Sequence, residues 1–172
     1  TRVANSAAND HKDHRVDFSA LPIGVAVAGG VVLVGTGVWI CRSDLRERLV
    51  PDSAVVATAS VGVLWLAFIG AGAGAWIAYL LSALVAGALF AVPAYVRPGS
   101  IGFGDVKLAF AYGLVLGPAV IFALLVSCLL GTAAGGVIAL RNGVAVARKA
   151  TVPFAPAIVT SALAVLCIGF AT

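Results

Sequence analysis

The sequence predicts an all-α integral membrane protein, a bundle of about six transmembrane helices. Of its 172 residues, 62% are hydrophobic, and only eleven Lys or Arg and seven Asp or Glu are present. Average soluble domains are about 45–50% apolar and about 25% charged, and a soluble fold of this size cannot bury so much apolar surface. This composition excludes an ordinary soluble enzyme, a disordered protein and a nucleic-acid-binding module. Continuous apolar runs also disfavour a transmembrane β-barrel, whose strands alternate apolar and polar residues.

A polar tail over residues 1–20 precedes a membrane-embedded domain over residues 21–172. Segment 10–14 of the tail, DHKDH, holds both histidines. Two His without a committed helix are weak evidence for a metal site, so we expect a solvated tail and no metal. The cysteines are scattered without a C-x-x-C pair, and we interpret them as small buried hydrophobic residues; they are Cys41, Cys128 and Cys167.

The first three predicted spans lie between residues 21 and 96. A helical crossing needs about 20 apolar residues, so residues 21–41 form one span. Residues 53–96 carry no charge, which is too long for one span and suits two. The glycine cluster at 70–74 favours a turn between them.

The last three spans are predicted from the uncharged stretch 108–140 and from residues 156–171. Gly117-Pro118 is a break signal within the first stretch. Pro is well tolerated in the first turn of a helix, so we expect the next span to begin there. The part before this break is too short to cross alone, so the fourth span must begin before Lys107. Two pairs, Gly113-x-x-x-Gly117 and Gly131-x-x-x-Gly135, could allow close helix packing, although such patterns also arise by chance in a Gly-rich chain.

Six spans place the three charged loops, 42–52, 97–107 and 141–149, on one side of the membrane. These loops hold eight of the eleven basic residues. Cytoplasmic loops carry the excess of Lys and Arg. We therefore expect the charged loops in the cytoplasm and both termini outside, in the cytoplasmic (plasma) membrane.

Four acidic residues lie outside the tail. Glu47 lies between two arginines, and we interpret it as a solvated loop charge. Asp52 follows Pro51 and precedes a span, so we expect it to cap a helix. Asp105 differs, because the fourth span must begin before Lys107, which places Asp105 at or below the membrane surface. Burying a carboxylate there is energetically costly, so such a residue is often functional.

Asp105 follows Gly102-Phe103-Gly104, and glycines permit positive φ and close backbone approach. Asp44, just after the first span, is expected on the same membrane face. Two carboxyls that share a site share a proton, and such a pair suits general acid/base chemistry on a water. The alternatives without a catalytic role are that Asp105 merely starts a span and that each Asp forms an ion pair with a nearby basic residue.

The chain resembles the type IV prepilin leader peptidases, which are membrane aspartic peptidases. Residues 44–52, DLRERLVPD, fit the spacing of the first family motif, and residues 102–107, GFGDVK, match Gly-x-Gly-Asp-x-Lys in full. A weaker match, VPFAP at 152–156, has Ala155 where the family usually has Gly. Many bacterial relatives add a domain with paired C-x-x-C motifs; without them, the chain looks like the short, peptidase-only form.

The resemblance implies an enzyme that cuts the basic leader from prepilin or pseudopilin precursors at the cytoplasmic face, after a Gly and before an apolar helix. It implies Asp44 and Asp105 as the catalytic pair, with no cofactor. Gly102 and Gly104 would leave room for the substrate backbone. Lys107 could tune Asp105 or contact the oxyanion, but we favour an interfacial charge that reaches the membrane surface. Expected partners are the precursor and membrane lipid.

Three alternatives remain open at this point. A presenilin-like intramembrane protease would also use Gly-x-Gly-Asp, but it would carry a Tyr-Asp partner and a Pro-Ala-Leu motif that the sequence lacks. A small transport or assembly subunit would place an acid near the middle of the membrane. A non-catalytic pilin-binding protein would not need both motifs intact.

Overall fold

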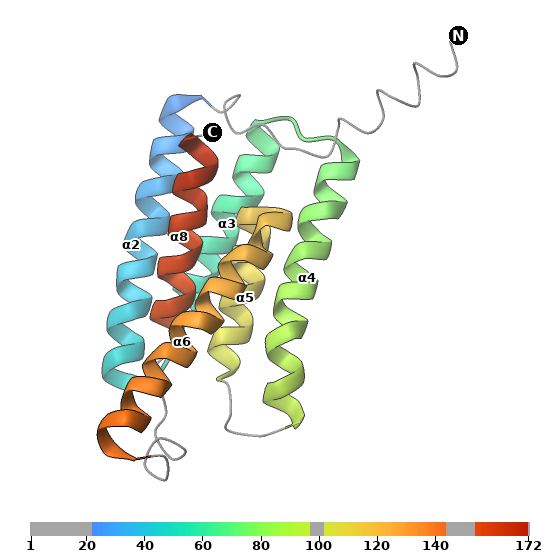
Figure 1. Cartoon of the computed structure of the whole chain (residues 1–172). Coiled ribbons are helices and arrows are strands. Elements are labelled where there is room, and N and C mark those ends of the chain that lie inside the picture. Colours follow the sequence, from blue (N-terminus) through green and yellow to red (C-terminus); the bar gives the residue numbers. More distant parts are fainter. Residues whose placement is uncertain (1–21, 97–101, 144–153, 172) are drawn as a thin grey trace.

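The computed structural model describes residues 22–96, 102–143 and 154–171, and in these ranges the secondary structure is helical, without strands. The α-helices are α2 (Ile23–Glu47), α3 (Asp52–Phe68), α4 (Ala73–Val96), α5 (Phe103–Leu116), α6 (Val120–Asn142) and α8 (Ala155–Ala171); a 3₁₀ turn, η2 (Gly117–Ala119), joins α5 to α6. The helices form an elongated bundle in which neighbouring helices run up and down (Figure 1). The predicted all-α fold is thus confirmed.

In the described part of the chain, three helical segments are long and apolar enough to cross a membrane: Ile23–Glu47, Ala73–Val96 and Phe103–Arg141. Two further apolar helices, Asp52–Phe68 and Ala155–Gly169, are shorter. Large hydrophobic side chains are exposed all around the bundle, as they are on a surface that faces lipid. The chain therefore has the helices of a membrane protein, while the six crossings and their orientation remain predictions.

The predicted breaks between helices are confirmed. Helix α3 ends before the glycine cluster, where Gly70 adopts a positive φ of 67°. Gly117, with a φ of 54°, ends α5, and the chain then reverses into α6 (Figure 1). Helix α5 begins at Phe103, before Lys107. Glycine is suited to both turns because it has no Cβ to oppose a positive φ.

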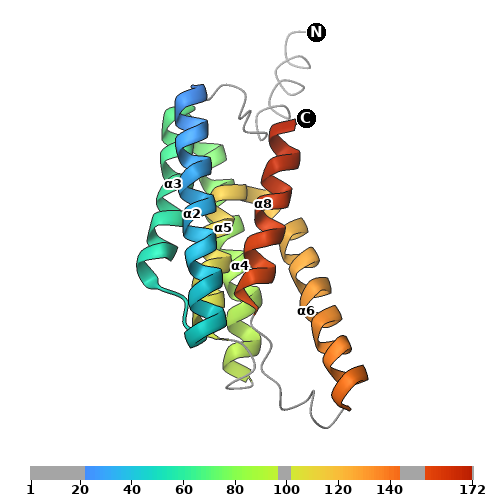
Figure 2. The same ribbon diagram turned by 90° about the vertical axis from the view of Figure 1, so that its left-hand side faces the viewer.

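Helix α5 lies inside the bundle, where it packs against α3, α4 and α8 (Figure 2). Its buried side chains contribute much of the hydrophobic core, together with Trp65 of α3. A helix buried on most sides must be apolar all round, and this explains why α5 carries charge only within its first five residues. The buried position of α5 fixes where its N-terminus, and therefore Asp105, can lie.

Small residues allow the close approach of α5 to α4. A Cβ at Gly113 would overlap the Cα of Ala83, and one at Gly117 would lie 2.6 Å from the Tyr79 ring. Both glycines of the first predicted pair therefore pack against α4. In the second pair only Gly131 is packed, against Phe154, whereas Gly135 faces open space.

Two hydroxyl pairs join helices inside the bundle. Thr36 of α2 and Thr58 of α3 lie 3.2 Å apart, Oγ1 to Oγ1. Ser127 of α6 is hydrogen-bonded to Ser161 of α8. All four side chains are buried. Interhelical hydrogen bonds of this kind hold helices together in membranes, where the hydrophobic effect between helices is weak.

Some sequence expectations are wrong. Helix α2 continues through Glu47, so Asp44 is helical and buried and does not lie in a loop. Asp52 is the first residue of α3 and not its cap, since Pro51 holds that position without a side-chain hydrogen bond. Of the cysteines expected to be buried, Cys128 and Cys167 are exposed, and Cys41 is partly buried. A thiol is apolar enough to face lipid as well as protein. The tail over 1–20 lies outside the described residues.

We predict that Gly113→Ala destabilises the fold by about 1–3 kcal/mol, because the added methyl overpacks the contact with Ala83. Gly135→Ala is the matched control. It adds the same methyl into open space and replaces Gly by a better helix former, so it should stabilise by about 0.5–1 kcal/mol. Unfolding of both variants in mixed detergent micelles measures the difference. Equal stability of the two variants would contradict the close packing of α5 on α4.

Candidate active site

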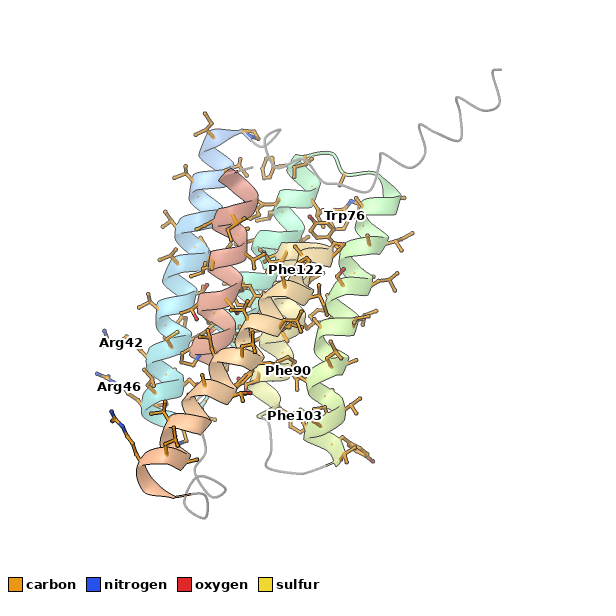
Figure 3. All side chains as sticks on the ribbon, in the orientation of Figure 1. Arg42, Arg46, Trp76, Phe90, Phe103 and Phe122 are labelled. Carbon is orange, nitrogen blue, oxygen red and sulfur yellow. The ribbon has the colours of Figure 1, made fainter. Side chains whose placement is uncertain are left out.

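The charged residues of the described ranges gather at one end of the bundle. They lie at the end of α2, the starts of α3 and α5, and the end of α6 (Figure 1). Arg42 and Arg46 project outward there, and Phe103 marks the start of α5 at the same end (Figure 3). The described parts of the charged segments thus lie together at one end of the bundle, while their common side of the membrane stays a prediction.

Asp44 and Asp105 are the two buried acids at this end. Asp44 lies in the last helical turns of α2 and is 7% exposed, and Asp105 lies in the first turn of α5 and is 9% exposed. The other described acids, Glu47 and Asp52, are exposed. Carboxylates are almost never buried without a partner, so this pair requires a specific explanation.

The two carboxyl groups are close enough for Asp44 to act electrostatically on Asp105. The chain direction explains the meeting, because α2 arrives at the charged end and α5 departs from it (Figure 1). Two carboxylates in a poorly solvated site repel each other, and the pair is most stable with one proton between them. One group can then accept a proton while the other donates one.

Asp44 is held by the backbone of α8. A hydrogen bond from the backbone of Ala155, the first residue of that helix, reaches the Asp44 carboxylate. Arg48 supplies a positive charge nearby. Its left-handed backbone, with a φ of 54°, ends α2, and its N–H donates to the Asp44 carbonyl at 3.0 Å. The Asp44 Oδ2 atom is buried and has no hydrogen-bond partner in the described part of the chain.

Asp105 is held by its own helix terminus. A hydrogen bond from the backbone of Gly102 reaches the Asp105 carboxylate, and the Asp105 N–H donates to the Gly102 carbonyl at 3.0 Å. The first turn of a helix also carries partial positive charge, which stabilises a nearby carboxylate. Asp44 lies near a helix C-terminus, which lacks this support. The two carboxyls therefore have unequal surroundings, although they lie close together.

The two motif glycines have different roles. A Cβ at Gly104 would lie 2.8 Å from the Cβ and Cγ2 atoms of Val50, in the segment between α2 and α3. Gly104 thus allows the two Asp motifs to pack directly on each other. A Cβ at Gly102 would lie 3.7 Å from Asp105 Oδ2, which is an ordinary contact. Neither glycine adopts a positive φ, so close approach at Gly104 is the structural reason for glycine.

Lys107 pairs with Asp52 and not with Asp105. The Lys107 Nζ atom lies 2.7 Å from Asp52 Oδ1, and the two side chains are 53% and 70% exposed. Residues two apart on a helix do not share a face, which separates Lys107 from Asp105. The ion pair links the start of α3 to the start of α5.

Sequence reasoning did not assign Ala155 or Val50 to the site. Ala155 lies in the third, weaker motif, but its contribution to the site comes from its backbone. Any residue type can make a backbone hydrogen bond, so the sequence does not reveal this role. Val50 lies inside the first motif, where only its apolar character is visible. Segment 10–14 of the tail lies outside the described residues, and among those described no group of three or more His, Cys, Asp or Glu could hold a metal ion.

We predict that Gly104→Ala destabilises the protein by about 1–3 kcal/mol, because the new methyl overlaps Val50. Val50→Gly in the same chain removes the opposing atoms and should recover part of the loss. Gly102→Ser is the control, since its Cβ has room and Ser is a favoured helix cap. A double-mutant cycle on unfolding free energies measures the coupling; independent effects of the Gly104 and Val50 substitutions would rule out this contact.

Comparison with known proteins places these motifs in one family. A model of the type IV leader peptidase family matches residues 31–136, a range that includes both Asp44 and Asp105. Searches of curated proteins and of solved structures found no match. The family match covers more than half of the 172 residues. The chain therefore belongs to the type IV leader peptidase family.

Proposed function

We propose that the protein is an aspartic endopeptidase that removes the basic leader from type IV prepilin-like precursors. The observation that carries the proposal is the meeting of two buried carboxyls, Asp44 and Asp105, from two separate motifs at one end of the bundle. Membership of a leader peptidase family supports a peptide substrate. The chemistry of a paired carboxyl site supports the aspartic mechanism.

In the proposed mechanism, a water lies between Asp44 and Asp105. The ionised carboxylate takes a proton from this water, and the oxygen attacks the carbonyl carbon of the scissile peptide bond. The protonated carboxyl donates its proton to the carbonyl oxygen, which gives a neutral tetrahedral intermediate. Collapse of the intermediate breaks the C–N bond, and the amine leaves with the proton that the first carboxylate had taken, while the second carboxylate takes a proton back from a hydroxyl of the intermediate. The pair then again shares one proton.

The unequal surroundings of the carboxyls suggest how the roles divide. Asp44 has the Ala155 backbone and the Arg48 charge to stabilise its negative charge, whereas the charge of Asp44 opposes ionisation of the buried Asp105. We propose that Asp44 carries the charge when substrate binds and acts as the base toward water. Asp105 then holds the proton and polarises the carbonyl. Such an assignment describes one microstate of a coupled pair.

The supporting residues receive more specific roles than the sequence allowed. Gly102 is exposed at the mouth of the site and has room beside it, so we assign to it the passage of the extended substrate backbone. Gly104 is occupied by Val50, and we assign to it the alignment of the two Asp motifs. Lys107 acts as an interfacial charge that fixes α3 to α5 through Asp52.

We propose a topology of six crossings, with the charged end of the bundle in the cytoplasm and both termini outside. The exposed arginines at the end of α2 support this orientation, because basic residues are retained on the cytoplasmic side. The enzyme is then a multi-pass protein of the cytoplasmic membrane. A precursor with its apolar helix in the bilayer would present the residues just before that helix to the Asp pair.

A transport or assembly subunit is less well supported. Ion-conducting membrane proteins place ionisable groups along the pathway across the bilayer. In the described ranges every charged residue lies at one end of the bundle, and the rest of each helix is uncharged. This distribution suits chemistry at one membrane surface.

We predict that Asp44→Asn and Asp105→Asn each reduce cleavage of a co-expressed prepilin by about 10²–10⁴-fold, the usual contribution of acid–base groups. Glu47→Gln is the matched control, because it also removes an acid near the end of α2 but from an exposed position. Immunoblots that separate precursor from mature pilin provide the measurement. Near-normal cleavage by either Asn variant would exclude the paired-carboxylate mechanism.

We predict that Lys107→Met leaves cleavage nearly unchanged, since an exposed ion pair contributes only about 0–1 kcal/mol. Asp52→Asn removes the other half of the pair and should have the same small effect. Initial cleavage rates of both variants are the measurement. A severe defect in Lys107→Met alone would instead assign Lys107 to the oxyanion.

A further inference from the structure

The first turn of α8 has one backbone donor left for the active site. The first N–H groups of an α-helix have no partner in the preceding turn. In α8, Pro156 has no N–H, and the next two N–H groups donate to the Phe154 carbonyl at 3.0 and 3.2 Å. Ala155 is fully buried, so its N–H requires a partner. That partner is the Asp44 carboxylate.

The side chain of Phe154, the residue before this donor, is held by two other helices. Its ring lies 5.7 Å from the ring of Phe90 in α4, centroid to centroid, with the planes tilted by 52°. This is a favourable arrangement for two aromatic rings. The ring also packs on Gly131 of α6, where a Cβ would lie 2.9 Å from Phe154 Cδ2 and closer still to Cε2. Glycine at 131 thus leaves the space that the ring occupies.

The backbone that follows Ala155 is held by α6 as well. Ser127 Oγ lies 3.3 Å from the carbonyl oxygen of Ala157, and it is hydrogen-bonded to Ser161. Both serines are buried. The chain is therefore fixed on each side of Ala155, by the Phe154 ring before it and by the serine pair after it. Together these contacts fix the direction of the Ala155 N–H.

We propose that Phe154 is a positioning residue for Asp44, and that it acts by holding the Ala155 N–H against that carboxylate. The ring does not touch the reacting atoms. A hydrogen bond to an ionised carboxylate is stronger than one between neutral groups, so a shift of this N–H weakens Asp44 as the base. The inference rests on the proposed peptidase function, and it adds Phe154 and Gly131, which lie outside both Asp motifs.

The test measures cleavage by variants of the full chain, reconstituted in lipid nanodiscs and compared at equal amounts of folded protein. The substrate is a synthetic precursor with a basic leader, a Gly and an apolar helix. We expect Phe154→Leu and Gly131→Ala each to lower kcat by about ten- to a hundredfold, as misplacement of a catalytic group does, with KM little changed. The matched controls on α6 are Phe122→Leu, at an exposed site, and Gly135→Ala, in open space; both should keep the wild-type constants.

A double variant separates displacement of the ring from a general loss of packing. The methyl group of Gly131→Ala overlaps the outer edge of the Phe154 ring, and a leucine side chain lacks these atoms. We therefore expect Gly131→Ala to cost no further kcat when it is added to Phe154→Leu. Losses of kcat that multiply in the double variant would overturn the proposal, because the two residues would then act independently.

The proton chemical shift of the Ala155 amide reports the hydrogen bond without any cleavage. We expect this resonance to move upfield in Phe154→Leu and in Gly131→Ala, as it does when Asp44→Ala removes the acceptor. An unchanged amide resonance in Phe154→Leu would overturn the proposal, and so would a higher KM at wild-type kcat. If the wild type cleaves no precursor, the proposed function fails, while the amide resonance still decides whether the ring holds the hydrogen bond.

Discussion

The burial of two carboxyl groups at one end of the bundle is the constraint on which the rest of the structure depends. Asp44 and Asp105 come from helices that meet at their opposite ends, α2 at its C-terminus and α5 at its N-terminus. An apolar bundle gives neither carboxyl much solvation, so each needs backbone hydrogen bonds and a nearby charge or helix dipole. Ala155, Arg48 and Gly102 supply these. The site thus draws on three segments of the chain.

The tight packing of helix α5 fixes the position of one of these carboxyl groups. The helix is short and lies within the bundle, where glycines let α4 approach closely and Gly104 accepts Val50. Each of these contacts leaves no space for a methyl group, so α5 cannot slide without a clash. Interiors packed in this way transmit small displacements. A rigid α5 therefore keeps Asp105 at a fixed depth and distance from Asp44.

The features that the sequence predicted well are those set by local patterns. Apolar runs located the helices, and glycines located the turns at Gly70 and Gly117. The motif spacing identified both aspartates, although it does not indicate that they are buried. The failures concern contacts across the bundle. Asp52 looked like a helix cap, but its partner is Lys107 from a helix 55 residues away in sequence. Such a partner follows from packing, which a local pattern does not contain.

The sequence by itself determined the class of protein, the helices and the two aspartates, because hydropathy, turn residues and motif spacing are properties of neighbouring residues. Only the tertiary structure decided how these aspartates are surrounded. It extended α2 so that Asp44 is buried, brought the Ala155 backbone to that carboxylate, and gave Gly104 a steric reason. The physical reason is that burial and hydrogen bonding depend on distances between helices, and these are fixed only when the side chains pack.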